Sequence, residues 1–139
     1  MTQGLYTVKE NYKIANDVYK MILAGDTSAV TAREESKNKK IDGLFLRRPI
    51  SVCDWDSETI TIIYKVVGTG TEQMSKMGAD AVLDVLVGLG NGFDTAKAGD
   101  SPLLIGGGVG TPPMYGLAKQ LVAEGKTPAV ILGFNGAGD

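Results

Sequence analysis

The sequence predicts an antiparallel β-barrel or β-sandwich followed by one strand–helix–strand unit. Three observations lead to this fold class. The first hundred residues carry six short segments rich in β-formers and a single proline, Pro49. Near Asp100 the pattern changes to an apolar strand, a glycine-rich turn and a helical repeat. The length of 139 residues fits one ordinary domain or two small ones.

In the first part, strands are expected at 6–15, 17–24, 41–46, 50–53, 59–67 and 82–87, with one short helix at 71–77. Gly25-Asp26 and Asp56-Ser57-Glu58 have the residue types of turns. The run 33–40 carries charges of both signs, which by default indicates a solvated loop or a sheet edge.

The second part is one strand–helix–strand unit, which is normally parallel and right-handed. Strands are expected at 101–105 and 127–132, on either side of a helix with apolar residues at i, i+3, i+4, i+7 and i+8 from Met114. Pro112 and Pro113 fit the first helical turn, and Gly125 fits the stop. The domains expected are 1–99 and 100–139. Two parallel strands and one helix cannot cover both sheet faces, so the chain is cut from a longer one, or the exposed face meets the barrel or another subunit.

Composition excludes several classes of function. The chain has no histidine, one cysteine and a net charge of −2. These values argue against a zinc or iron–sulfur site, against histidine catalysis and against a nucleic-acid surface. No apolar run reaches the ~18 residues of a membrane helix, and the first fifteen residues contain no secretory signal. The expectation is a cytoplasmic protein whose difficult chemistry, if any, belongs to an organic cofactor.

Two glycine segments follow predicted strands and precede predicted helices. Gly108-Val109-Gly110-Thr111-Pro112-Pro113 has the spacing G-x-G-x-x-P. It is either a nucleotide-binding turn or a tight turn without a ligand. Gly68-Thr69-Gly70-Thr71 is either a second phosphate-binding nest or a plain helix start with Thr71 as N-cap.

Three further features have two interpretations each. In Arg47-Arg48-Pro49-Ile50-Ser51, an arginine could pair with a phosphate, or the two arginines are simply exposed. The loop Gly88-Leu89-Gly90-Asn91-Gly92-Phe93 could lie against a flat ligand or serve as a linker. Cys53 is expected to pack in the core, and Trp55 is expected to pack there rather than to serve as a stacking platform for a ligand.

Taken together, these motifs resemble the electron-transfer subunits of the two-subunit, NAD-linked dihydroorotate dehydrogenases, in the ferredoxin reductase superfamily. The resemblance runs from about Tyr6 to Asn135. It rests on the order and spacing of five segments, namely 46–53, 63–65, 68–71, 88–93 and 106–113.

The resemblance implies a flavin-binding type of barrel followed by a partial Rossmann-like βαβ unit. It further implies an oxidoreductase subunit whose FAD passes electrons between the FMN-containing catalytic subunit of dihydroorotate dehydrogenase and NAD, in pyrimidine biosynthesis. The implied FAD residues are Arg48, Pro49, Ile50, Ser51, Ile63, Tyr64, Lys65, Gly70 and Thr71. The implied NAD residues are Gly106, Gly107, Gly108 and Gly110.

Two features depart from the family. The family's two-iron–two-sulfur cluster is held by four cysteines in a C-terminal region that this chain lacks. The polar run 33–40 stands where the family has an apolar strand, so that barrel edge is displaced or the sequence is altered there. The alternatives are therefore a related reductase subunit with another partner, or a non-catalytic fragment or scaffold that binds no flavin. Activity of this chain alone stays open, and a hetero- or homo-oligomer is expected.

Overall fold

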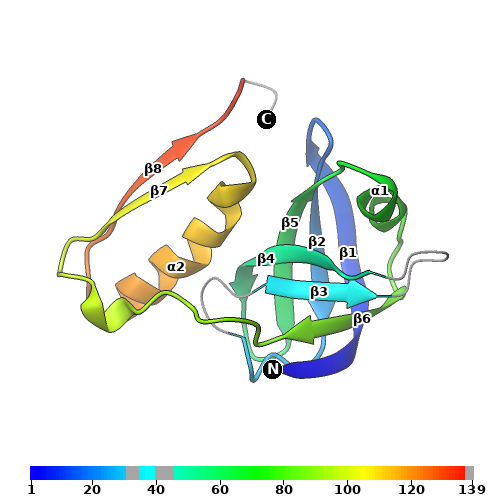
Figure 1. Ribbon diagram of the computed structural model, residues 1–139, viewed down its shortest axis with the longest axis horizontal. Coiled ribbons are helices and arrows are strands. Elements are labelled where there is room, and N and C mark those ends of the chain that lie inside the picture. Colours follow the sequence, from blue (N-terminus) through cyan, green and yellow to red (C-terminus); the bar gives the residue numbers. More distant parts are fainter. Residues whose placement is uncertain (31–34, 40–45, 137–139) are drawn as a thin grey trace.

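The computed structural model describes residues 1–30, 35–39 and 46–136, with the course of the backbone for 35–39. The chain forms two parts that lie side by side, an antiparallel barrel and a smaller α/β unit (Figure 1). This is the fold class that the sequence predicts, with a barrel rather than a sandwich in the first part.

Six antiparallel strands close the barrel in the order β1-β2-β5-β4-β3-β6. β1 and β2 form a hairpin with a two-residue turn, in which Asp17 has a positive φ of 55°. Side chains alternate along β5 so that Ile60, Ile62 and Tyr64 point inward. The strands are β1 (Thr2–Ala15), β2 (Val18–Ala24), β3 (Glu35–Lys39), β4 (Arg48–Trp55), β5 (Thr59–Lys65) and β6 (Val82–Val87).

The polar segment is a barrel strand, which corrects the expectation of a solvated loop, a sheet edge or a displaced edge. β3 pairs with β4, where Ser36 lies opposite Ile50, and with β6, where Lys37 lies opposite Leu86. The pairing of β3 with β4 and β6 is made by backbone N–H and C=O groups, so it does not require apolar side chains. A polar strand can therefore close the barrel and cover the edges that β4 and β6 would otherwise expose. The expected strand at 41–46 falls outside the described residues except for Leu46, which lies in a bend.

The barrel interior is an apolar core that includes Tyr6, Val8, Met21, Leu23, Ile60, Ile62, Leu83 and Val85, each at most 1% exposed. Helix α1 (Thr69–Ser75) covers one end of the barrel beside β1, and its Met74 joins this core. The helix begins two residues earlier than the sequence predicts.

The α/β unit contains β7 (Leu103–Gly107), the short 3₁₀ turn η2 (Gly108–Gly110), α2 (Thr111–Ala123) and β8 (Ala129–Gly133). β7 and β8 are parallel, as expected. Pro112 and Pro113 lie in the first turn of α2, and Gly125 follows the helix with a φ of 82°. Three of the five predicted face positions (Met114, Leu117 and Leu121) are buried with Leu104, whereas Val122 is 61% exposed.

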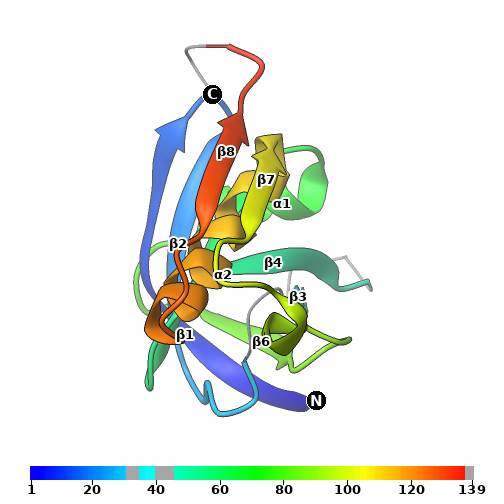
Figure 2. The ribbon, with the colours of Figure 1, turned by 90° about the vertical axis from the view of Figure 1, so that its left-hand side faces the viewer.

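Within the part of the chain that the structure describes, only one face of the sheet in the α/β unit is covered. Figure 2 shows β7 and β8 in front of α2, with the barrel behind the helix. Leu103, Ile105 and Ile131 are more than half exposed on the outer face. The barrel therefore does not cover this face, which was one of the arrangements expected from the sequence.

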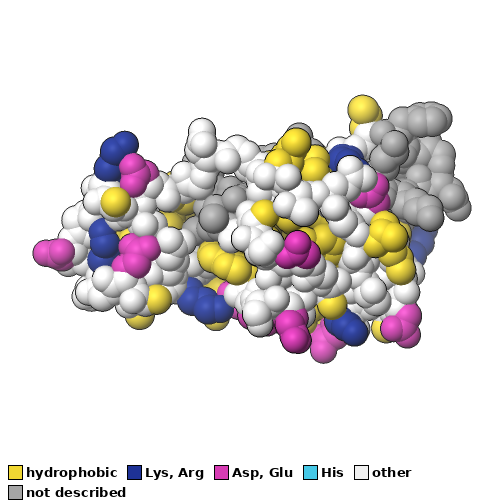
Figure 3. Space-filling view, turned by 90° about the horizontal axis from the view of Figure 1, so that it is seen from below, with side chains coloured by type: hydrophobic (Ala, Val, Ile, Leu, Met, Phe, Trp, Pro, Cys, Tyr) yellow, Lys and Arg dark blue, Asp and Glu magenta, His cyan; other side chains and the backbone are white. Residues whose placement is uncertain are grey.

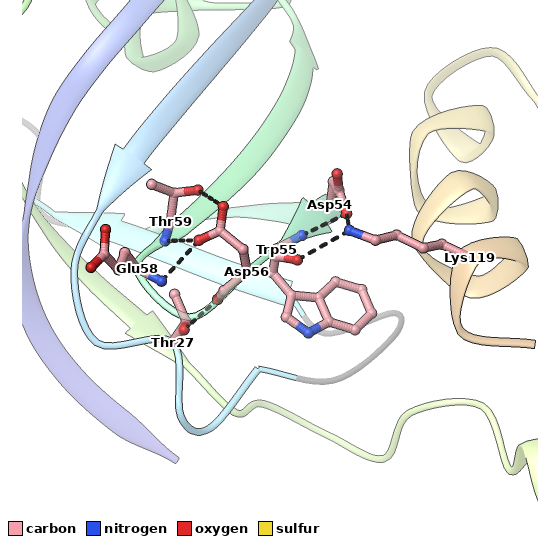
Figure 4. A network of polar contacts seen from close by, with 7 residues as sticks. All are labelled: Thr27, Asp54, Trp55, Asp56, Glu58, Thr59 and Lys119. Carbon is pink, nitrogen blue, oxygen red and sulfur yellow. Dashed lines mark hydrogen bonds and ion pairs between the residues drawn. The ribbon is translucent and has the colours of Figure 1, made fainter. Parts of the chain in front are cut away.

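Helix α2 is seated closely on β4. A Cβ at Gly116 would lie 2.8 Å from the carbonyl oxygen of Cys53 and 2.7 Å from the Trp55 ring, so only glycine allows this approach. Lys119 donates to Asp54 at 2.7 Å beside the same contact (Figure 4). Trp55 packs against both cores, as expected of a packing residue.

The helices and the surface charges show two further features of the molecule. Among the described residues, no helix is both long and apolar enough to cross a membrane. On the face shown in Figure 3, basic and acidic side chains are interspersed over both parts of the molecule.

Candidate functional site

A cavity of about 510 Å³ lies between the barrel and the α/β unit. Its lining residues come from the β1–β2 hairpin, from Cys53 of β4, from β5, from the η2 turn, from α2, and from β8 with the residues after it. Most of the lining side chains are apolar, which is typical of sites for flat organic ligands. The lining includes Ile14, Val18, Cys53, Ile63, Tyr64, Lys65, Gly108, Thr111, Tyr115, Ala118, Val130, Leu132 and Phe134.

Four of the sequence-predicted site residues, Ile63, Tyr64, Lys65 and Gly108, line this cavity. The Tyr64 ring stacks on Tyr19 with ring centroids 5.9 Å apart. Burial raises the pKa of the Tyr64 hydroxyl to about 12, so that it keeps its proton well into the alkaline range. It donates to Oδ1 of Asn11 at 3.0 Å.

Arg48 and Gly70 meet at one end of the barrel, although they are 22 positions apart in the chain. A Cβ at Gly70 would lie 2.7 Å from Cζ and 2.9 Å from Nη2 of Arg48. The guanidinium therefore lies directly over the backbone at the start of α1, and a larger residue at position 70 would displace it. Arg48 also donates from Nη1 to the carbonyl oxygen of Leu46.

The neighbouring Arg47 has a different role. Its guanidinium donates to both carboxylate oxygens of Asp84 at 3.0 Å and to the Asp84 carbonyl oxygen at 2.9 Å. Both side chains are about one-fifth exposed. Arg47 thus ties the start of β4 to β6, which leaves Arg48 as the arginine of this pair that faces α1.

Thr71 stabilises the start of α1 although it is itself a residue of the helix and not its N-cap. Its hydroxyl oxygen accepts from the N–H of Val67 at 2.9 Å and of Gly68 at 3.3 Å. The N-cap is Gly68, and Thr71 is the third helical residue. The interpretation of Thr71 as a plain N-cap is therefore wrong, because its side chain caps backward onto the preceding turn.

Pro49, Ile50 and Ser51 continue β4 from Arg48 and do not line the cavity. Ile50 is 8% exposed and belongs to the barrel core. Pro49 is exposed and Ser51 is half-buried. These residues are brought near Arg48 by the strand itself.

The glycine turn has one crowded position and three open ones. A Cβ at Gly106 would lie 2.9 Å from the Met114 side chain and 3.0 Å from the Gly110 carbonyl oxygen. No atom would meet a Cβ at Gly107, Gly108 or Gly110, and Gly108 has a φ of 51°. The crowding explains Gly106 by packing, whereas open space beside the other three leaves their backbone accessible to a ligand.

Several lining residues were not among the site residues predicted from the sequence, although Thr111 belongs to the glycine-turn motif 108–113. Thr111 has a buried Oγ1 with no hydrogen-bond partner among the described residues. Tyr115, Leu132 and Phe134 line the cavity although each is exposed. Their role depends on how α2 and β8 sit against the barrel, which no local pattern reports. The loop 88–93 does not line this cavity, and its Phe93 lines a smaller one of about 280 Å³ beside α2.

The chain's donor set does not fit an iron–sulfur cluster. Its one cysteine, Cys53, is buried, and its pKa is raised to about 11, chiefly by burial. In the described ranges no three histidine, cysteine, aspartate or glutamate side chains gather as a metal site.

No protein-family model matches the chain. Among curated proteins, it is 39% identical over 146 residues to the electron transfer subunit of dihydroorotate dehydrogenase B (NAD(+)) from Listeria welshimeri, covering 100% of this chain and 57% of that protein. The protein of the same name from Fusobacterium nucleatum is 41% identical over 137 residues, covering 93% of this chain and 53% of that protein.

The chain is a homologue of the dihydroorotate dehydrogenase B electron transfer subunit. This confirms the resemblance found in the sequence. This chain spans little more than half the length of the curated relatives that it matches.

Solved structures show that the homologue has a ferredoxin reductase-type FAD-binding fold. It superimposes on an Amycolatopsis cytochrome P450 reductase with a TM-score of 0.83 at 22% identity, over 99% of this chain and 44% of that one. Phthalate dioxygenase reductase gives a TM-score of 0.79, also at 22% identity, over 95% and 43%. An NADH-dependent reduced ferredoxin-NADP oxidoreductase gives a TM-score of 0.79 at 28% identity, over 95% and 49%.

Proposed function

We propose that this homologue binds FAD and serves as the electron-transfer subunit of a dihydroorotate dehydrogenase, passing electrons between a catalytic subunit and NAD. The contact of Arg48 with Gly70 carries the proposal. It places a cation against the glycine backbone of α1, at the end of the barrel that this helix covers, in a chain whose curated relatives are named for electron transfer. The proposed compartment is the cytoplasm.

The residues present fit FAD in two places. Arg48 and the backbone at Gly70 and Thr71 would hold the pyrophosphate, because a guanidinium forms charge-assisted bonds with phosphate oxygens. The cavity beside Ile63, Tyr64 and Lys65 would hold part of the flavin, since its walls are apolar and its volume is adequate for a flat ring system. Pro49 and Ile50 would fix the strand that carries Arg48, with Ser51 at the flavin side. Bound flavin would supply the hydride chemistry, and the chain would supply position and electrostatics.

The glycine turn is the proposed contact for NAD. The backbone at Gly107, Gly108 and Gly110 is open to a ligand, and the turn leads directly into the N-terminus of α2. Gly106 would act by allowing the close packing of β7 on α2. We place the boundary between a flavin domain at 1–99 and a nicotinamide unit at 100–139.

The proposal assigns no iron–sulfur step to these residues, because one buried cysteine cannot supply four ligands. A second candidate function is that of a related reductase subunit with another electron partner. The 28% identity to a ferredoxin-NADP oxidoreductase favours that candidate. Association with, and electron transfer from, a dihydroorotate-oxidising catalytic subunit would distinguish the two.

The test of FAD binding is the substitution Arg48→Ala, with Lys76→Ala as control. Lys76 is a cation beside the other end of α1, where it pairs with the exposed Glu72. We expect Arg48→Ala to weaken FAD at least about tenfold, the lower range for losing a charge-assisted hydrogen bond. Lys76→Ala should bind FAD like the unmodified protein. Full flavin occupancy in Arg48→Ala would contradict the role assigned to Arg48.

A further inference from the structure

Asn11 of β1 joins two parts of the proposed flavin site that are separate in the sequence. Its Nδ2 donates to the carbonyl oxygen of Met74 at 2.8 Å and to that of Met77 at 2.9 Å. Its Oδ1 accepts from the Tyr64 hydroxyl at 3.0 Å. One half-buried side chain thus binds the C-terminal end of α1 on one side and the cavity wall on the other.

Helix α1 depends on contacts with the rest of the protein for its stability. It has seven residues, too few for a helix to be stable alone in water. The last carbonyl groups of a helix have no partner within it. Asn11 donates to the carbonyl oxygen of Met74 in the last turn of α1, which also accepts from the Met77 N–H at 3.1 Å, and to the carbonyl oxygen of Met77, two residues past the helix. It therefore holds the whole helix at a fixed distance from β1.

The same amide fixes the cavity wall. Tyr64 is 3% exposed, and its ring is held between Tyr19 and the hydrogen bond to Asn11. Rotation of the Tyr64 side chain would break this bond and leave the Asn11 oxygen without its donor. The position of Tyr64 is therefore linked through Asn11 to the position of α1.

We propose that Asn11 is a positioning residue for the dinucleotide: it sets α1, which faces the phosphates, relative to Tyr64 of β5, the strand that lines the cavity proposed for the flavin. The inference rests on the proposed function, and it names the residue that connects the phosphate part of the proposed FAD site to the flavin part. Asn11 touches neither half of the ligand in this account. It acts through the carbonyl groups of Met74 and Met77 and through the Tyr64 hydroxyl.

Asparagine has the donor and acceptor that this position needs. Aspartate has almost the same shape and keeps an acceptor for Tyr64, but it has no hydrogen to offer the two carbonyl groups. Its carboxylate would face their oxygens and push α1 away. Tyr64→Phe removes the other half of the bridge and leaves the ring in place.

The experiment measures the dissociation constants of FAD and of riboflavin for the purified protein and for Asn11→Asp, Tyr64→Phe and Gln3→Ala. Gln3→Ala is the matched control, because Gln3 is an amide on the same strand that donates to Oδ2 of Asp84, where β1 pairs with β6, and bonds neither α1 nor Tyr64 among the described contacts. Riboflavin has no pyrophosphate, so it reports the cavity without the contribution of α1. Circular dichroism checks that each variant is folded.

We expect Asn11→Asp to weaken FAD at least about tenfold and riboflavin by much less, and Tyr64→Phe to weaken both a few-fold. Gln3→Ala should change neither. Equal weakening of FAD and riboflavin by Asn11→Asp would indicate a general loss of structure and would overturn the positioning role. Unchanged FAD binding by a folded Asn11→Asp would overturn it as well.

Three other outcomes are also decisive. If Asn11→Asp does not fold, Tyr64→Phe decides, and unchanged flavin binding in that variant would show that the bridge does not position the ligand. If the unmodified protein binds neither FAD nor riboflavin, the proposed function fails, and the role of Asn11 fails with it. A protein that binds FAD with no effect of either substitution contradicts only the role of Asn11.

Discussion

Adjacent residues with the same chemistry have different roles in this chain. Arg47 is committed to Asp84, whereas Arg48 lies over Gly70. The sequence indicates that an arginine before Pro49 is important, and the resemblance selects Arg48. The ion pair of Arg47 could not be predicted, because it joins β4 to a strand 37 positions away in the chain.

Cys53 and Tyr64 make the stability of the protein sensitive to alkaline pH. Burial raises the pKa of Cys53 from 9.0 to about 11 and that of Tyr64 from 10.0 to about 12. Above about pH 9 the unfolded chain therefore releases protons that the folded chain keeps. The free energy of unfolding should be level up to about pH 9 and should fall between about pH 9 and 12.

Urea denaturation at a series of pH values measures this fall. Cys53→Ala should lower stability at all pH values, because it leaves a small cavity, but it should flatten the fall between about pH 9 and 11. Tyr64→Phe should flatten the part above about pH 10. A free energy of unfolding that stays constant to pH 11 would show that these groups titrate alike in both states.

Gly116 tests the close seating of α2 on β4. Gly116→Ala places a methyl group 2.8 Å from a backbone oxygen, which cannot move aside as a flexible side chain can. Overpacking costs about 1–3 kcal/mol, whereas alanine in a helix gains about 1 kcal/mol over glycine. We therefore expect a net loss of up to about 2 kcal/mol in thermal or chemical denaturation. The control is Gly99→Ala, which should leave the free energy of unfolding unchanged because a Cβ there meets no atom. If Gly116→Ala made the protein more stable, the close packing of α2 on β4 would be contradicted.

At the scale of elements, local patterns locate most strands and helices but not all of their ends. The glycine turn and the helix after it are found because proline, glycine and the 3.6-residue repeat act locally. β3 is missed because its sequence is polar and only its two neighbours make it a strand. Helix α1 begins at Thr69 instead of Thr71, since Thr71 bonds backward to Gly68.

The start of α1 gives a prediction at this scale. Thr71→Val keeps the shape of a side chain that is 8% exposed but removes the oxygen that accepts from Val67 and Gly68. Each of these hydrogen bonds contributes about 0.5–1.5 kcal/mol net, so the midpoint of urea denaturation should fall. Thr69→Val, at the exposed first position of the same helix, should change it little. Equal midpoints for the two variants would contradict this role of Thr71.

At the scale of the whole molecule, the candidate site arises from contact between the two parts. Ile63, Tyr64, Lys65 and Gly108 could be named from the sequence through the resemblance, and the structure brings them to one cavity. Asn11 and Phe134 could not, because each reaches the site only through the tertiary fold. The chain spans little more than half of its curated relatives, so the activity of a whole electron-transfer subunit is a proposal for this homologue.

The most direct test of the central claim is the visible absorption spectrum of the protein after incubation with FAD and gel filtration. We expect flavin absorption bands to elute with the protein, because Arg48, the start of α1 and the cavity beside Tyr64 form a site for the dinucleotide. Arg48→Ala, passed through the same column, should elute with much less flavin. A folded protein that elutes without colour after incubation with excess FAD would contradict the account and favour a scaffold that keeps the fold without the cofactor.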